Sequence, residues 1–166
     1  TQLFPDSILS GEEEDTIIHD TSYTNSIHKI YLSGSIDASR IIESDLIIFY
    51  RTSDIPGRAY FRAVATSLGI VEEVRTSESF TNEQEFVDYC KSYSLFNEST
   101  LRSYYKKNAI AIKFLYTTAF NHKVIRKKLL ENVGIPNDRW VIVPLNDQQF
   151  NHIIELANIN PRLIHN

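Results

Sequence analysis

The chain has 166 residues, of which 42% are hydrophobic and 23% charged, and its formal net charge is −4. That length suits one domain with a substantial core, and the composition is that of an ordinary globular protein. No apolar run approaches the ~20 residues needed to span a bilayer and no signal-peptide pattern opens the chain, so we expect no membrane partner. The single cysteine excludes an internal disulfide framework and predicts a reducing, cytoplasmic location.

The negative charge is concentrated before Lys29, the first basic residue. The acidic residues in that stretch are Asp6, Glu12, Glu13, Glu14, Asp15 and Asp20. Without them the rest of the chain carries a small positive charge. Because phosphate binding depends on where cations cluster, the negative total does not exclude a nucleic-acid partner.

The first part of the chain divides into a lead-in and the start of a folded domain. Residues 1–26 are acidic, polar and rich in Ser and Thr, which predicts an irregular lead-in, and residues 27–166 are expected to form a single domain. Within it, 27–32 has the composition of a strand, and 36–42 fits a short helix capped by Ser35.

Residues 45–51 give the clearest strand, because they are β-branched, aromatic and apolar on both faces, as a central strand should be. A loop with a Pro-Gly turn follows at 52–57, and 60–74 is expected to be a long strand. The loop is of hairpin length and too short for the crossover of a parallel βαβ unit. It therefore favours a mixed α+β fold over a doubly wound parallel sheet.

Helices are expected to dominate the middle of the chain. Residues 81–84 form a capping box, and a second helix is expected to start at Asn97. Strand composition returns at 109–120, and 121–133 is expected to be helical, with Gly134 as its cap.

The last elements are a strand and a helix. Residues 140–145 have strand composition, and Asn146 is expected to cap a helix that carries one apolar stripe, made of Phe150, Ile153, Ile154 and Ala157. The elements together predict an α+β fold: a curled mixed sheet or small barrel with surrounding helices.

The patterns that usually mark catalytic sites are absent from the sequence. The five glycines are far apart, so no phosphate-cradling loop exists, and there is no nucleophile elbow. The five histidines and single cysteine show no metal-ligand spacing. We expect no cofactor, no metal and no catalysis by this chain itself.

Two groups of residues suit nucleic-acid binding. The first lies at the end of the central strand and combines aromatic, guanidinium and hydroxyl groups: Tyr50, Arg51, Thr52, Ser53, Arg58, Tyr60 and Arg62. Such a mixture suits base stacking with contacts to base edges and phosphates. Core packing of Tyr50 and Tyr60, with solvated arginines, explains the same composition.

The second group is a basic cluster at Lys123, Arg126, Lys127 and Lys128. Arg102, Lys106 and Lys107 accompany the aromatic pair Tyr104 and Tyr105 nearby in the sequence. Cations interleaved with aromatics are typical of a nucleic-acid face. The polar exterior of ordinary helices accounts for them equally well.

The segment Ser44-Asp45-Leu46-Ile47-Ile48-Phe49-Tyr50-Arg51-Thr52 resembles EVE-type domains of the PUA-like superfamily, which includes the ASCH domains. Those domains have a Gly-Asp pair before an apolar strand ending in Phe-Tyr-His-Ser, so Ser44 stands where the family has glycine. Arg62 to Val74 resembles the next strand of the family, and Leu145 to Phe150 resembles its end. The resemblance implies a PUA-like fold and favours the loop at Tyr50 as a binding site, without identifying its ligand.

A closer likeness is to the PUA-like domain found C-terminal to GNAT-type acetyltransferases, carried by Leu3 to Ser7, Ser26 to Ser33 and Tyr50 to Asp54. The acetyl-CoA loop of those enzymes is absent here. The resemblance implies an accessory module with an attached N-terminal catalytic domain. The lack of any methionine, even at position 1, agrees with a piece of a larger protein.

The sequence thus predicts a nucleic-acid-binding domain for RNA or modified DNA. Tyr31 or Tyr50 would stack on a base, Ser33, Thr52 and Ser53 would read its edge, and the cations would hold the backbone. The cations are Arg51, Arg58, Arg62, Lys123, Arg126 and Lys127. Two alternatives stay open. One is an ASCH-like hydrolase of modified nucleosides or RNA, with Lys29 or a Thr/Ser hydroxyl as nucleophile partner and a carboxylate such as Glu72 or Glu73 as base. The other is a protein-interaction module.

Overall fold

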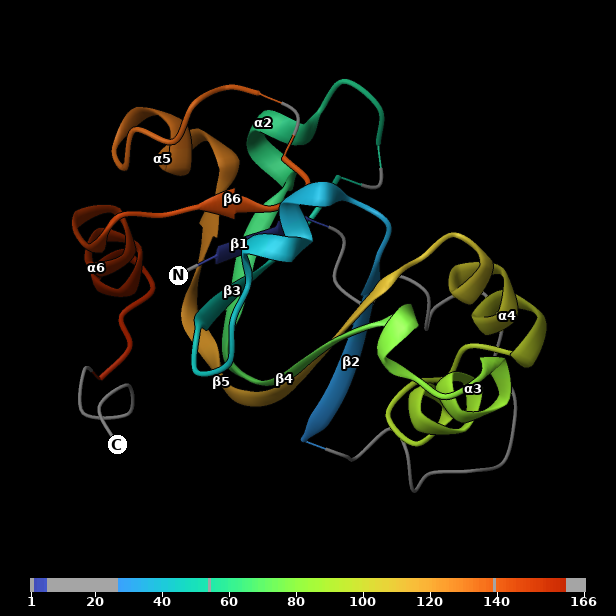
Figure 1. Ribbon diagram of the computed structural model, residues 1–166. Helices are drawn as coiled ribbons and strands as arrows, with labels where there is room; N and C mark the ends of the chain where they lie inside the picture. Colours follow the sequence, from blue (N-terminus) through green and yellow to red (C-terminus); the bar gives the residue numbers. More distant parts are fainter. Residues whose placement is uncertain (1, 6–26, 54, 139, 161–166) are drawn as a thin grey trace. The chain divides into compact units, whose positions relative to one another are not determined.

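The computed structural model describes residues 2–5, 27–53, 55–138 and 140–160 (Figure 1). The chain forms two compact units, each built from separate stretches of sequence. The described part of the first, here called the β3 unit, comprises residues 2–5, 46–69 and 117–160. The described part of the second, the β2 unit, comprises residues 27–45 and 70–116.

The β3 unit is organised around the strand β3 (Leu46–Arg51), whose residues 47–50 are all buried. The strand order in this unit is β5-β4-β3-β1-β6. The strand β1 (Gln2–Pro5) pairs in parallel with β3 and antiparallel with β6 (Val143–Pro144). The sheet is therefore mixed, β3 is central as expected, and the doubly wound parallel alternative is excluded.

Three helices complete the β3 unit: α2 (Ala59–Arg62), α5 (Arg126–Glu131) and α6 (Asp147–Leu156). The predicted cap of α6 is confirmed, since the Asn146 side chain accepts from Gln149 N and the Gln149 side chain accepts from Asn146 N. The predicted stripe is also buried, and it packs with Tyr50, Leu129 and Trp140 in one core. Gly134 follows α5 with φ +76°, a conformation that favours glycine.

The β2 unit carries the strand β2 (His28–Ser33), which pairs antiparallel with the first residues of β5 (Ile110–Ile125). The strand order in this unit is β2-β5-β4, where β4 spans Val64–Thr76. Two 3₁₀ turns, η2 (Ile36–Arg40) and η3 (Ser77–Ser79), accompany the helices α3 (Glu83–Lys91) and α4 (Glu98–Lys106). Ser35 caps η2 through its side chain, as predicted.

The core of the β2 unit is aromatic, and it contains the cysteine. Phe80, Phe86 and Leu101 pack around Cys90, which is fully buried and unpaired. Burial raises the pKa of the Cys90 thiol to about 12. Cys90 is therefore a packing residue, as its place in an amphipathic helix predicts.

The structure differs from the sequence prediction at several element boundaries. Residues 2–5 of the expected irregular lead-in form β1, while residues 6–26 lie outside the described part. The strand expected at 60–74 begins only at Val64, because Ala59–Arg62 form α2. The helix expected at 121–133 begins at Arg126, because β5 continues to Ile125 with Phe120 and Val124 buried in the core.

Two further differences concern caps and the last strand. Asn82, rather than Thr81, caps α3, and its side chain accepts from Glu85 N. The last strand is limited to Val143–Pro144 instead of 140–145. Across the described residues, no helix is long and apolar enough to cross a membrane.

Candidate functional site

A cluster of two aromatic rings and one guanidinium group lies in the β3 unit. Tyr50, at the end of β3, is only 1% exposed, and its ring meets Trp140 edge-on with centroids 5.0 Å apart. The guanidinium carbon of Arg126 lies 3.9 Å from the centroid of the Trp140 ring, and Arg126 Nη1 donates to the Tyr50 hydroxyl at 3.0 Å. Tyr50 is thus a core residue that positions Arg126, and its ring faces are not open for stacking on a base.

The other hydrogen-bond partners of Arg126 are also neutral. Its Nη2 donates to Asn137 Oδ1 at 3.3 Å and to the Asp138 carbonyl at 3.1 Å. No carboxylate within the described residues lies within ion-pairing distance of this guanidinium. The positive charge of Arg126 is therefore held in place without being neutralised, which favours an anion near it.

The short helix α2 packs against α5, and this brings two separate stretches of sequence together (Figure 1). Arg126 N donates to the Ala63 carbonyl at 2.8 Å, and the Tyr60 hydroxyl donates to the Glu131 carboxylate. That hydrogen bond, followed by burial and the charge of Glu131, raises the pKa of Tyr60 above its usual range. Tyr60 therefore stays neutral and links the two helices.

The contact between the helices creates a cationic surface, here called the α2–α5 surface and defined by Arg58, Phe61, Arg62, Arg126 and Lys127. Arg58, Phe61 and Arg62 are exposed, while Arg126 and Lys127 are partly buried. The Lys127 ammonium lies 5.8 Å from the centroid of the Phe61 ring and 3.9 Å from a Glu131 carboxylate oxygen. The structure thus joins Arg58 and Arg62 to Arg126 and Lys127, which are far apart in sequence.

The loop after β3 contains the other predicted contact residues. Arg51 and Thr52 are exposed, and Ser53 is partly buried. The Ser53 hydroxyl donates to the Ile55 carbonyl at 2.9 Å and accepts from Ile55 N at 3.1 Å, so it shapes the turn.

Lys123 was expected on the same helix as Arg126, but it lies on β5, three residues before α5 begins. Its side chain is exposed. Within the described residues, Arg51, Arg58 and Lys123 take part in no ion pair. All three are therefore available to a phosphate.

Tyr31 and Ser33, also predicted as contact residues, belong to β2 and hence to the other unit. Tyr31 is partly buried, whereas Ser33 is only 4% exposed and its Oγ accepts from Ser35 N at 3.1 Å. Ser33 thereby supports the turn before η2.

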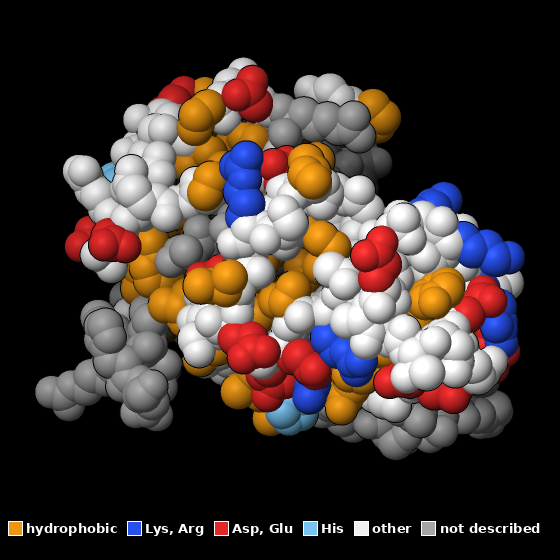
Figure 2. All heavy atoms as spheres, viewed as in Figure 1, with side chains coloured by type: hydrophobic (Ala, Val, Ile, Leu, Met, Phe, Trp, Pro, Cys, Tyr) orange, Lys and Arg blue, Asp and Glu red, His pale blue; other side chains and the backbone are white. Residues whose placement is uncertain are grey.

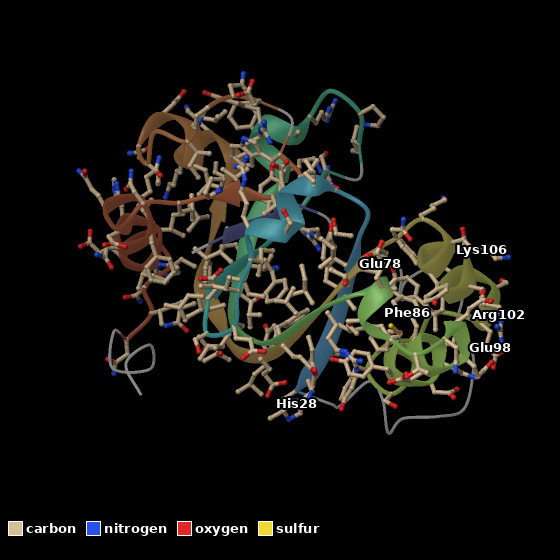
Figure 3. All side chains as sticks on the ribbon, in the orientation of Figure 1. His28, Glu78, Phe86, Glu98, Arg102 and Lys106 are labelled. Carbon is tan, nitrogen blue, oxygen red and sulfur yellow. The ribbon has the colours of Figure 1, made fainter. Side chains whose placement is uncertain are left out.

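In the second half of the predicted basic cluster, Arg102 on α4 is paired with acidic neighbours. Arg102 lies 3.6 Å from Glu83 and 3.7 Å from Glu98, and Lys91 contacts Glu98 at 2.7 Å. Figure 3 shows Glu98 and Arg102 together on α4, and Figure 2 shows basic and acidic side chains alternating along this edge. Tyr104 and Tyr105 pack against Phe96 and Phe86, so they serve the core.

The residues named for a hydrolase lie in the β2 unit and have other partners. Glu72 accepts from His28 Nδ1 at 2.8 Å and lies 3.6 Å from Lys113 Nζ, while Glu73 accepts from the Tyr89 hydroxyl at 2.7 Å. Neighbouring residues of a strand point to opposite faces, so Lys29 points away from the side on which His28 meets Glu72. The pairing of Lys29 with Glu72 is therefore not supported by this geometry.

The same region shows no assembled metal site. Burial lowers the pKa of Lys113, but the hydrogen bond with Tyr93 and the charge of Glu72 raise it by more. The pKa of Lys113 is therefore above its usual value, and Lys113 stays a cation. In the part of the chain that the structure describes, no group of three or more His, Cys, Asp or Glu side chains could hold a metal ion.

Sequence reasoning missed two residues of the β3 unit. Phe61 was assigned to a strand, where it would alternate with Tyr60, and Trp140 was read only as the start of a strand. The structure places Phe61 at 63% exposure on α2 and Trp140 beneath Arg126. The one available signal was the Arg-x-x-Phe-Arg spacing of Arg58, Phe61 and Arg62, which places cations beside an aromatic ring on a helix.

The chain has an ASCH/PUA-like fold, as the sequence predicts. Two solved structures of one ASCH protein from Zymomonas mobilis show the likeness. A variant of it matches with a TM-score of 0.60 and 11% identity over 93% of this chain and 94% of that chain. The unsubstituted protein matches with a TM-score of 0.59 and 10% identity over the same shares.

A hypothetical protein from Leishmania major also matches, with a TM-score of 0.52 and 12% identity over 95% of this chain and 93% of that chain. No protein-family model matches the sequence, and neither does any curated protein. At such low identities the likeness establishes the fold alone.

Proposed function

We propose that this chain is a cytoplasmic accessory domain that binds nucleic acid, RNA or a strand with a modified base, without catalysing a reaction. The supporting observation is the α2–α5 contact. The helix α2, which carries Arg62 and follows Arg58, packs against α5, which carries Arg126 and Lys127, and this supports one cationic surface made from two distant stretches. Cations near an exposed aromatic ring suit a phosphate backbone with unstacked bases.

The roles within the surface follow from burial and hydrogen bonding. Arg51, Arg58 and Lys123 are exposed and in no ion pair within the described part, so they suit phosphate contacts. Arg126 is held by Tyr50 and Trp140 and suits a fixed, directional contact. Thr52 is exposed at the mouth of the loop and suits a base edge.

The decisive experiment is salt-dependent binding of the chain to a mixed pool of RNA and modified DNA. The double variant Arg58→Ala with Arg62→Ala should bind all sequences more weakly and show a flatter salt dependence, by about 0.7 in the log–log slope per lost phosphate contact. The matched control is Lys106→Ala with Lys107→Ala, which removes the same charge from exposed positions of the β2 unit.

Three results would count against the proposal. The first is no binding to any oligonucleotide at low salt. The second is an equal loss in the test and control variants. The third is unchanged affinity when both Arg51 and Arg58 are replaced by alanine.

The likeness to the domain that follows GNAT-type acetyltransferases supports a further part of the proposal, that this is the accessory module of an attached N-terminal catalytic domain. The isolated chain should then bind RNA but neither bind acetyl-CoA nor cleave RNA. Turnover of RNA or modified nucleosides that disappears in Lys29→Ala would instead establish the hydrolase alternative.

A further inference from the structure

Phe61 is unusual among the aromatic residues of the described part of the chain. Five large hydrophobic side chains are exposed there, namely Ile27, Ile36, Ile42, Phe61 and Leu95, and Phe61 is the only aromatic among them. Single exposed apolar residues are common on protein surfaces. The exposure acquires meaning only through what surrounds the ring.

The orientation of the Phe61 ring is set by its neighbours. The ring meets Tyr60 edge-on at 90°, with centroids 4.8 Å apart. Tyr60 is itself fixed by its hydrogen bond to Glu131, and the end of α2 is fixed by the bond from Arg126 N to the Ala63 carbonyl. A planar ligand would therefore meet a ring whose position is largely settled before binding.

A cation from the neighbouring helix lies near the Phe61 ring, and two arginines stand close to Phe61 in the sequence. The Lys127 ammonium lies 5.8 Å from the ring centroid, and Arg62 is the next residue on α2. Arg58 stands at the start of the same helix, and no residue of α2 is buried. An apolar protein partner would remove these cations from water, whereas a nucleotide offers a base to the ring and phosphates to the cations.

We infer that Phe61 is a stacking platform for an unpaired base, and that the α2–α5 surface consequently selects single-stranded over double-stranded nucleic acid. This rests on the proposed function and deepens it. A base within a duplex is stacked on its neighbours and cannot cover the ring, while a single strand can turn one base out. The cations alone would bind both forms.

The test compares three probes: a fluorescently labelled single-stranded oligouridylate, an RNA duplex of the same length, and heparin. Phe61→Ala should weaken binding of the single strand about 5- to 100-fold, because stacking of one base is worth about 1–3 kcal/mol. Affinity for the duplex and for heparin should not change. Since Phe61 is exposed, the variant should fold normally, and Ile36→Ala, which removes an exposed apolar side chain from the β2 unit, is the matched control.

Phe61→Trp gives a second readout. It should retain the affinity for the single strand and add an exposed tryptophan whose fluorescence the single strand quenches. The chain has only one native tryptophan, the buried Trp140, so the unsubstituted protein supplies the background signal.

The outcomes separate this inference from the proposed function. Equal affinity of the unsubstituted chain for single strand and duplex, or an equal loss for both in Phe61→Ala, would overturn the stacking role and leave nucleic-acid binding intact. Absence of binding to every probe would overturn both together.

Discussion

Arg126 of the β3 unit and Arg102 of the β2 unit have opposite kinds of partners. In the β2 unit, Arg102 and Lys91 meet carboxylates of Glu83 and Glu98. In the β3 unit, Arg126 lies on an aromatic ring and donates to neutral oxygens. In the first arrangement, ion pairs between basic and acidic side chains hold helices together. In the second, neutral partners fix the position of the guanidinium, and no carboxylate among the described residues neutralises its charge. A cluster of basic residues in a sequence is compatible with both arrangements, so its partners determine what it does.

The largest expected effect separates two arginines that both lie on aromatic rings, Arg126 over Trp140 and Arg75 over Phe80 at 3.6 Å. Arg126→Met should lower the free energy of unfolding by about 2–4 kcal/mol, because a charged hydrogen bond and a cation–π contact are lost. It should also weaken RNA binding. Arg75→Met should cost about 1–2 kcal/mol and leave affinity unchanged, since Arg75 lies beside Glu85 at 3.7 Å.

Urea unfolding and binding titrations on both variants measure this difference. Tyr50→Phe is the control that separates stability from charge: it removes the hydroxyl that accepts from Arg126 and keeps the guanidinium. Its stability should fall while most of the affinity is retained. Equal loss of affinity in Arg126→Met and Arg75→Met would end the distinction between the two units.

A smaller effect is expected at two backbone positions with positive φ, one in each unit. Gly134 in the β3 unit has φ +76° and Ser44 in the β2 unit has φ 71°. Gly134→Ala should lower the free energy of unfolding by about 1–2 kcal/mol, because alanine is strained at this positive φ. A steric clash adds nothing, since no atom lies within 4 Å of the added Cβ. Ser44→Gly should stabilise by up to about 1 kcal/mol, because glycine adopts this conformation readily.

Thermal unfolding of the two variants tests both signs at once. A destabilised Ser44→Gly would show that the serine side chain contributes more than the strain costs.

The smallest effect concerns the acid sensitivity of the β2 unit. The hydrogen bond from Lys91, then its charge and that of Arg102, lowers the pKa of the Glu98 carboxyl below its ordinary 4.5. A lowered folded-state pKa stabilises the protein above the ordinary value, and this stabilisation is lost as the pH falls through the folded-state pKa. Glu98→Gln should therefore lose little stability below that range and somewhat more at neutral pH.

Urea midpoints of the unsubstituted chain and Glu98→Gln, followed from neutral to acidic pH, measure this difference. Glu78→Gln is the control, because Glu78 is exposed on η3 and is in no ion pair within the described residues (Figure 3). If both variants follow the same pH profile, the ion pairs of Glu98 contribute nothing to the pH dependence of stability.

Local sequence patterns were sufficient to predict those elements that have a clear hydrophobic pattern or a capping residue. The two-faced apolar strand at 45–51 and the helix capped by Asn146 were predicted almost to their ends. The helix expected at 121–133 began late, because burial of Phe120 and Val124 against distant residues extends β5. No local pattern reports such long-range burial.

The candidate site divides in the same way. Composition identified Arg58, Arg62, Arg126 and Lys127, but only the packing of α2 on α5 shows that they share one surface. Tyr50 has the composition expected of a stacking residue, yet it is buried, and the exposed ring belongs to Phe61 instead. Which of several aromatic residues faces solvent depends on the tertiary fold.

The buried Cys90 has a practical consequence for chemical labelling. It is the only cysteine of the chain, and burial with a pKa near 12 leaves almost no thiolate at neutral pH. Maleimides should therefore leave the folded protein unmodified. A cysteine introduced at Lys123 would be the single reactive handle, and a photoactivatable crosslinker attached there could capture a bound strand without first removing the native thiol.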